Sequence, residues 1–227
     1  MSDRHLANSP TPVDSSDGRE HNDSTVERIM SRLDEMHTAR EQAIREGRDI
    51  IRNSANAIRA LHRGDVAVAT ALIDETAMKI QAVRTATAAH PSIYWAGYVQ
   101  DAMKEYAEAA ITSAILQNAP VPSPETLGVE DAAYLNGLAE AASELRRDCL
   151  DALRAADTER AIHLLDHMDT IYTELVIVDF PDAMTGGLRR TTDQLRAVLE
   201  RTRGDVTLSV RQERLEKALR AREDHLR

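Results

Sequence analysis

One helical pattern runs without interruption over residues 24–64, and it limits the possible folds more than any other feature of this sequence. The segment starts with Ser24-Thr-Val-Glu27, a capping box in which the serine and glutamate side chains each satisfy a free backbone N–H at a helix start. Apolar residues then recur at roughly helical spacing: Ile29, Leu33, Met36, Ile44, Ile51, Ile58 and Leu61. A helix of this length is about three times the globular mean. It indicates a helical bundle, or an oligomer whose subunit is spanned by one helix.

The rest of the chain has the same helical character. Of its 227 residues 42% are hydrophobic but only 3% aromatic, with 9 glycines and 7 prolines, a composition typical of an α-helical bundle. After the first helix we expect helices over residues 65–89, 91–118, 130–156, 158–180, 182–203 and 206–227, with a proline-rich loop at 119–128. The sequence therefore predicts an all-α fold with one domain over residues 24–227. Residues 1–23 have little to bury and are predicted to form a disordered tail.

Three features of the composition concern location and charge. Cys149 is the only cysteine, so one chain can form no internal disulfide. No apolar run approaches the roughly 20 residues that cross a bilayer, and residues 1–23 lack the apolar centre of a signal peptide. We therefore expect a cytoplasmic protein without a membrane partner. The net charge of −10 argues against indiscriminate binding of nucleic acid but leaves local basic patches possible.

Two pairs of glutamates are the strongest candidates for chemistry. Glu105 and Glu108 lie three residues apart, and Glu140 and Glu144 lie four apart, on the polar faces of successive predicted helices. The ordinary interpretation is a solvated surface. Like charges at these spacings, however, cost a few tenths of a kcal/mol on an isolated helix, and a bound cation would reverse that sign. Mg²⁺ and Mn²⁺ prefer oxygen ligands, and such ions activate water and neutralise phosphate in nucleases.

Other residues admit a plainer interpretation beside a functional one. His163 and His167 share a helix face at a spacing that suits a transition metal, but no Glu-x-x-His dyad accompanies them, so a packing coincidence is favoured. Cys149 falls within an apolar stripe, which favours a buried structural thiol over a nucleophile. A basic stripe on the first two helices is either a solvated face paired with acids or a set of phosphate contacts. Its members are Arg48, Arg52, Arg59, Arg63, Lys79 and Arg84, with Arg45 nearby.

Four segments resemble the translin and Trax (translin-associated factor X) family. Tyr134-Leu-Asn-Gly-Leu-Ala-Glu140-Ala-Ala-Ser-Glu144-Leu-Arg-Arg resembles its central motif, and Glu105-Tyr-Ala-Glu108-Ala resembles the Trax segment with two glutamates three apart. Arg48-Asp-Ile and Leu61-His-Arg63 are similar to the long first helix of the family, and residues 188–200 resemble its sixth. The resemblance covers residues 35–208.

The resemblance implies a seven-helix fold and an octameric barrel that binds single-stranded RNA and DNA in a closed interior. In Trax, acidic residues facing that interior supply Mg²⁺-dependent endoribonuclease activity. Glu105, Glu108, Glu140 and Glu144 stand where Trax has its acidic set, with Glu140 replacing an aspartate. One departure concerns the basic segment of translin. The corresponding residues of this chain, 91–100, include no basic residue. Tyr94, Trp95 or Tyr98 could stack on bases in its place, or could belong to the core.

The leading hypothesis is therefore a metal-dependent endoribonuclease that acts on single-stranded RNA inside a homo-oligomeric barrel. Glu108 and Glu144 would be the primary ligands of Mg²⁺ or Mn²⁺, and Glu105 and Glu140 would complete the site or orient water. One alternative is a non-catalytic oligomer that binds single-stranded RNA or DNA. Another is a di-metal oxidoreductase in which the carboxylates act together with His163 and His167.

Overall fold

The computed structural model describes residues 16–225, with side chains from residue 25 onward. The predicted disordered tail at 1–23 lies largely outside these residues, and its last part differs from the prediction. Helix α1 (Ser16–His62) begins at Ser16 and not at Ser24. The sequence from Ser16 to Ser24 has no proline and only one glycine, so nothing in it prevents the helix from starting earlier than the capping box.

The described residues form helices and no strand, which confirms the predicted all-α class. Five long helices follow α1: α2 (Val66–Thr87), α4 (Gly97–Leu116), α6 (Asp131–Arg154), α7 (Thr158–Val176) and α9 (Leu188–His225). Three one-turn helices lie between them: α3 (Pro91–Tyr94), α5 (Pro124–Leu127) and α8 (Asp182–Thr185).

Two predicted boundaries near the C-terminus were wrong. The helix expected over 182–203 is broken at Gly186 and Gly187, whose φ angles of +61° and +83° lie in the left-handed region that favours glycine. The break expected after residue 203 does not occur, because Gly204 stays helical between the buried residues Thr202 and Val206. The predicted helix over 91–118 is also divided, since Ala96 takes an extended conformation between α3 and α4. The seven expected helices thus become six long helices and three single turns in the described chain.

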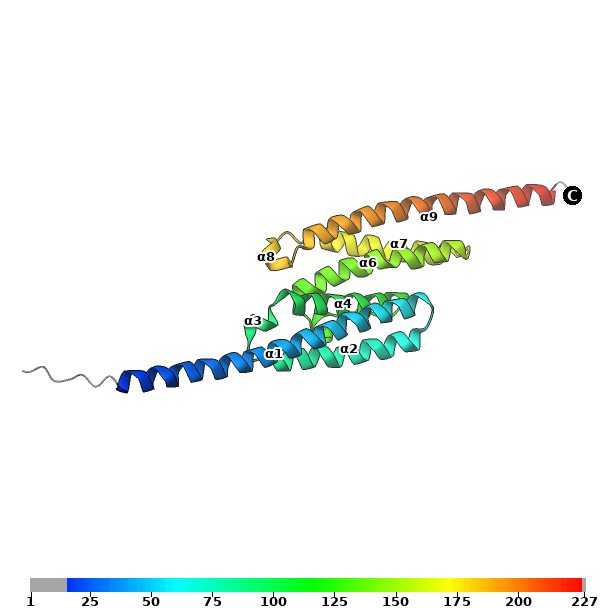
Figure 1. The fold of residues 1–227 in the computed structure, drawn as a ribbon. Helices are drawn as coiled ribbons and strands as arrows, with labels where there is room; N and C mark the ends of the chain where they lie inside the picture. The colour runs from blue at the N-terminus through cyan, green and yellow to red at the C-terminus, as the bar shows by residue number, and fades with distance from the viewer. Residues whose placement is uncertain (1–15, 226–227) are drawn as a thin grey trace, which may run out of the picture.

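The long helices form two groups that meet where α4 packs against α6 (Figure 1). Helices α1, α2 and α4 pack on one another in the first group, and α6, α7 and α9 do so in the second. Their shared core is rich in aliphatic side chains, with Met103, Ile111, Leu145, Leu164 and Leu195 fully buried. The junction between α4 and α6 therefore runs through the middle of the molecule.

One glycine sets the distance between these two helices. A Cβ atom added at Gly137 on α6 would lie 2.8 Å from the carbonyl oxygen of Lys104 and 2.8 Å from the Cβ of Ala107, both on α4. Real Cβ atoms do not approach other atoms so closely, so only glycine permits this contact. This close contact lies beside Glu108, whose backbone nitrogen would be 3.1 Å from the added Cβ atom.

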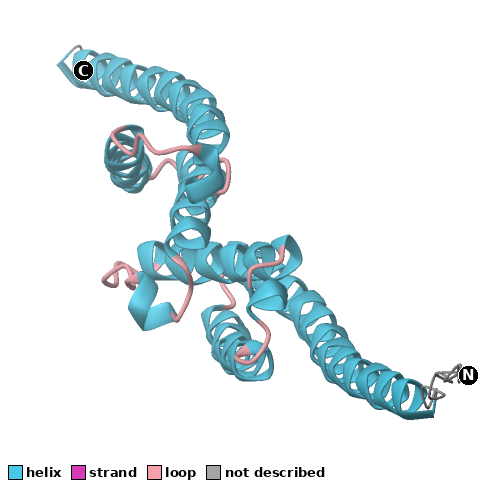
Figure 2. Cartoon of the chain, turned by 90° about the vertical axis from the view of Figure 1, so that its left-hand side faces the viewer, coloured by secondary structure: helices cyan, strands magenta, loops and turns pink. Residues whose placement is uncertain are grey.

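The start of α1 and the end of α9 project from opposite ends of the molecule (Figures 1 and 2). Apolar side chains remain exposed on both projections: Val26, Met30 and Leu33 on α1, and Leu208, Leu215 and Leu219 on α9. One chain therefore leaves apolar helix faces uncovered at both of its described ends.

Candidate metal centre

The structure brings the predicted glutamates together at the junction of α4 and α6. One carboxylate oxygen from each of Glu105, Glu108 and Glu140 lies within 4.8 Å of the others, a spacing that suits a shared metal ion. Glu144, one turn further along α6, lies near enough to raise the pKa of Glu108. The four carboxylates are called the glutamate cluster below.

The glutamate cluster is less exposed than the sequence predicted. The pattern placed all four carboxylates on water-facing surfaces, whereas they are partly buried between the two helices. Burial, followed by the charges of Glu105, Glu140 and Glu144, raises the pKa of Glu108 to about 8. Burial and the neighbouring carboxylates thus favour the protonated form of Glu108, whereas a divalent cation would favour the ionised form.

Lys104 supplies a positive charge within the cluster. Its Nζ lies 2.7 Å from Oε2 of Glu140 and 3.0 Å from Oε1 of Glu105, so it joins the two helices. Burial acts to lower the pKa of Lys104, but its bonds to Glu140 and Glu105 outweigh that effect and raise the pKa. Sequence reasoning missed this role, although Lys104 is one of only three lysines and directly precedes Glu105.

His62, at the end of α1, holds the fourth glutamate. Its side chain is only 2% exposed, with Nε2 placed 2.5 Å from Oε1 of Glu144 and Nδ1 placed 3.0 Å from Oδ2 of Asp148. Burial raises the pKa of Asp148, and the neighbouring His62 opposes that rise. Asp148 lies four residues after Glu144 on the same face of α6, which was the only sequence signal for this arrangement.

The other two titratable candidates behave as the plainer interpretations expected. His163 and His167 contact each other edge to face, with ring centroids 4.7 Å apart, and neither belongs to the metal-capable group of the described residues. The oxidoreductase hypothesis needs histidines of α7 beside the carboxylates, and the described chain does not form that arrangement. Cys149 is fully buried, as predicted, and burial raises the pKa of its thiol to about 11.

The predicted basic stripe divides into two kinds of residue. Lys79 is engaged within the chain, with its Nζ 3.2 Å from Glu46 and 3.5 Å from Asp49, while Arg84 donates a hydrogen bond of 2.7 Å to the carbonyl of Gly128. The other members, Arg48, Arg52 and Arg59 on α1 and Arg63 directly after it, are exposed. Arg52, Arg59 and Arg63 contact Asp49, Asn56 and Asp65, which lie two or three residues away in the chain. Phosphate contacts by the stripe remain a prediction, and the exposed arginines are the members best placed to make them.

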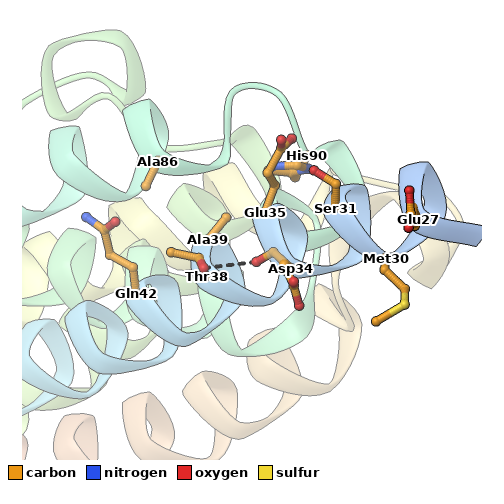
Figure 3. Close-up of a pocket in the computed structure, with 10 residues that line it drawn as sticks. All are labelled: Glu27, Met30, Ser31, Asp34, Glu35, Thr38, Ala39, Gln42, Ala86 and His90. Atoms are coloured by element: carbon orange, nitrogen blue, oxygen red, sulfur yellow. Dashed lines mark hydrogen bonds between the residues drawn. The ribbon is translucent and has the colours of Figure 1, made fainter. Parts of the chain in front are cut away.

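A cavity of about 770 Å³ lies between the projecting part of α1 and the end of α2 (Figure 3). Its acidic lining residues, Glu27, Asp34 and Glu35, all come from α1, and Thr38 donates a hydrogen bond of 2.9 Å to the carbonyl of Asp34 beside them. The cavity shares no residue with the glutamate cluster.

In the described part of the chain, no helix is both long and apolar enough to span a membrane.

No family model matches the chain. An uncharacterized protein of Methanocaldococcus jannaschii, MJ0175, is 26% identical over 194 residues, which are 85% of this chain and 86% of that protein. Among solved structures, AfC3PO is 32% identical with a TM-score of 0.76, and the match covers 82% of this chain and 96% of AfC3PO.

Two further structures agree with this match. AfC3PO in complex with duplex RNA is 31% identical with a TM-score of 0.74, over 82% of this chain and 96% of that one. The apo form of NeC3PO has a TM-score of 0.74 at 18% identity, over 81% of this chain and 96% of NeC3PO, and so supports the fold alone.

Fold and site together define a class: all-α proteins in which two neighbouring helices present paired carboxylates to each other. The C3PO structures are of this all-α fold, and AfC3PO matches over nearly its whole length. The chain belongs to the translin/Trax family.

Proposed function

We propose that this protein is a divalent-metal-dependent endoribonuclease of the Trax type that cleaves single-stranded RNA. The observation that carries the proposal is the glutamate cluster, in which oxygens of Glu105, Glu108 and Glu140 lie within 4.8 Å of one another and burial, followed by the neighbouring carboxylates, raises the pKa of Glu108. Carboxylates held together against their own repulsion are the donor set that a hard divalent cation needs.

The donor set fits Mg²⁺ or Mn²⁺. Glu108 and Glu144 would be the primary ligands, and Glu105 and Glu140 would complete the site or orient water. When bound, such an ion makes water more acidic and neutralises phosphate charge. The chain itself holds the donors in place: Lys104 contacts Glu105 and Glu140, and His62 contacts Glu144.

RNA binding and self-association are part of the same proposal. AfC3PO, which matches at 31% identity, was solved in complex with duplex RNA. The exposed apolar faces of α1 and α9 support assembly with further copies of the chain. We propose a homo-oligomer, an octamer by family resemblance, whose closed interior takes single-stranded RNA and also single-stranded DNA.

The test is cleavage of an end-labelled single-stranded RNA with Mg²⁺, with EDTA and with Glu108→Gln. We expect cleavage only by the wild type with Mg²⁺. Glu200→Gln is the matched control, because Glu200 is exposed on α9 and should leave cleavage unchanged. Binding of Mn²⁺, followed by electron paramagnetic resonance, gives a second readout that does not depend on turnover. Undiminished cleavage by Glu108→Gln would contradict the proposed site.

One observation favours a second candidate, a non-catalytic RNA-binding oligomer. The Lys104 ammonium already lies between Glu105 and Glu140, so a tethered cation could serve there in place of a metal. That candidate predicts salt-sensitive RNA binding with neither cleavage nor measurable Mn²⁺ affinity.

A further inference from the structure

A second cavity, of about 420 Å³, adjoins the glutamate cluster: Glu140 belongs to both, and Lys104, which contacts the cluster, lines the cavity. Its other walls include Trp95, which follows α3, and Met184 on α8. We infer that this cavity is a subsite for one unpaired base of the RNA. The inference rests on the proposed function, and it adds to that function a site that selects which kind of RNA is bound.

The apolar part of the cavity is unusually exposed. The side chains of Trp95 and Met184 are 59% and 66% exposed, although both are large and apolar. Stacking of a nucleobase on an aromatic ring, with a thioether beside it, would remove this surface from water. A nucleobase also suits a cavity of this size, since small-ligand sites begin at about 300 Å³.

The tryptophan ring is held by its neighbour. Tyr94 and Trp95 meet edge to face, with centroids 5.2 Å apart and ring planes at 84°. The hydroxyl of Tyr94 donates a hydrogen bond to Glu130, and burial together with this bond raises the pKa of Tyr94 to about 12. Tyr94 is therefore anchored to the N-terminus of α6, and an ordered neighbour lowers the entropic cost of using the Trp95 ring as a stacking surface.

The two amide side chains of the cavity favour stacking over recognition of a particular base. The amide of Asn136 donates to the carbonyls of Ala132 and Thr185, at 2.8 and 2.7 Å, and its oxygen accepts a bond from Thr191. The amide of Gln100 donates to the carbonyl of Tyr94 at 2.9 Å. Since these amides are used within the chain, we expect little preference among the four bases.

The position of the cavity explains why the base must be unpaired. A nucleotide whose base entered it would carry its phosphate toward Lys104 and Glu140, at the edge of the glutamate cluster. A base inside a duplex is stacked on both sides and cannot enter without leaving the helix. The subsite would thus select single-stranded RNA at the step that places a phosphate beside the carboxylates.

Trp95 is the only tryptophan in the chain, so its fluorescence reports on this cavity directly. The full-length protein is titrated, in EDTA to prevent cleavage, with an octamer of adenosine nucleotides and with a matched octamer of abasic ribose phosphates. We expect the adenosine octamer to quench the fluorescence and to bind about tenfold more tightly than the abasic octamer. Anisotropy of end-labelled octamers gives the affinities.

Variants at Trp95 test whether the cavity causes the difference in affinity between the two octamers. Trp95→Ala should lose about tenfold in affinity for the adenosine octamer and nothing for the abasic octamer, while Trp95→Phe should keep most of the difference. Phe180→Ala is the matched control, because Phe180 is an aromatic residue that is 60% exposed and does not line the cavity.

Three results would overturn the subsite: no quenching by the adenosine octamer, equal affinity of Trp95→Ala and wild type, or a changed sedimentation coefficient of Trp95→Ala. The last would show that Trp95 packs between copies of the chain. If the proposed nuclease activity were wrong and the subsite right, the adenosine octamer would still quench the fluorescence in EDTA, but the wild-type protein with Mg²⁺ would leave RNA intact.

Discussion

At the scale of single residues, Glu108 is a carboxyl group whose ionised form the site disfavours. Its carboxyl group lies near Glu105, Glu140 and Glu144, with Lys104 as the nearby opposite charge, and its pKa is raised from 4.5 to about 8. Between these values the folded chain keeps a proton that the unfolded chain has released. Metal-free protein should therefore lose stability as the pH rises from about 4.5 to about 8.

Glu108→Gln should remove this loss, because the amide carries no charge to be buried. We expect the variant to be more stable than the wild type at pH 8 in EDTA, by on the order of 2 kcal/mol, and nearly equal to it at pH 5. Thermal unfolding at the two pH values measures the difference. An identical pH slope in both proteins would show that Glu108 is not the titrating group.

His62 gives a second prediction at this scale. Its ring contacts both Glu144 and Asp148, so His62→Ala leaves Glu144 without the group that orients it. Loss of such an orienting partner typically weakens metal affinity about 10- to 100-fold. We expect a decrease of that size in Mn²⁺ affinity, measured by paramagnetic resonance, and none for the control His163→Ala on α7. Equal affinity in wild type and His62→Ala would contradict the role.

At the scale of the elements, the approach of α4 to α6 is the feature on which the site depends. Gly137→Ala would place a methyl group 2.8 Å from the backbone of Lys104, so the helices must separate. We expect a loss of about 1–3 kcal/mol in unfolding free energy from overpacking, together with weaker Mn²⁺ binding. Chemical denaturation and the paramagnetic titration measure the two effects.

Gly204→Ala is the matched control for that substitution. Gly204 also lies inside a helix, α9, but a Cβ atom added there meets nothing within 4 Å. The same change should therefore stabilise the protein by about 0.5–1 kcal/mol through helix propensity alone. If both glycines responded alike, the close contact at Gly137 would not explain its effect.

The sequence predicted the elements better than the site. Apolar periodicity located the long helices because it is a property of each helix alone, and it failed at Gly186, Gly187 and Gly204, where a glycine can either end a helix or continue it. The structure brings Glu105, Glu108 and Glu140 close together, while the function of these glutamates stays a prediction. Their burial was predicted wrongly because the pattern of one helix does not show which helix packs against its polar face.

The partners of the glutamates could not be predicted for a related reason. His62 and Glu144 are 82 positions apart in the chain, and Lys104 and Glu140 are 36 apart. Contacts of this kind depend on how α1, α4 and α6 pack, which no local spacing reveals. Only Asp148, on the same face of α6 as Glu144, had a signal in the sequence.

At the scale of the whole molecule, the projecting ends of α1 and α9 lead to a prediction about assembly. Met30 and Leu33 are 58% and 51% exposed on α1 although they follow the apolar pattern of that helix. If copies of the chain cover them, the double substitution Met30→Glu with Leu33→Glu should shift the protein to a smaller species in sedimentation velocity. Ile177→Glu, at an exposed residue after α7, should not. Unchanged sedimentation of the double variant would exclude this face from the assembly.

The position of the glutamate cluster has a consequence for how the molecule holds together. The α1–α2–α4 group and the α6–α7–α9 group meet mainly through α4 and α6, and the carboxylates lie along that contact. A cation bound by both helices would connect two groups that could otherwise melt one after the other, so the ion would increase the cooperativity of unfolding as well as the melting temperature. Sharper calorimetric transitions with Mn²⁺ than with EDTA would be the sign of this coupling.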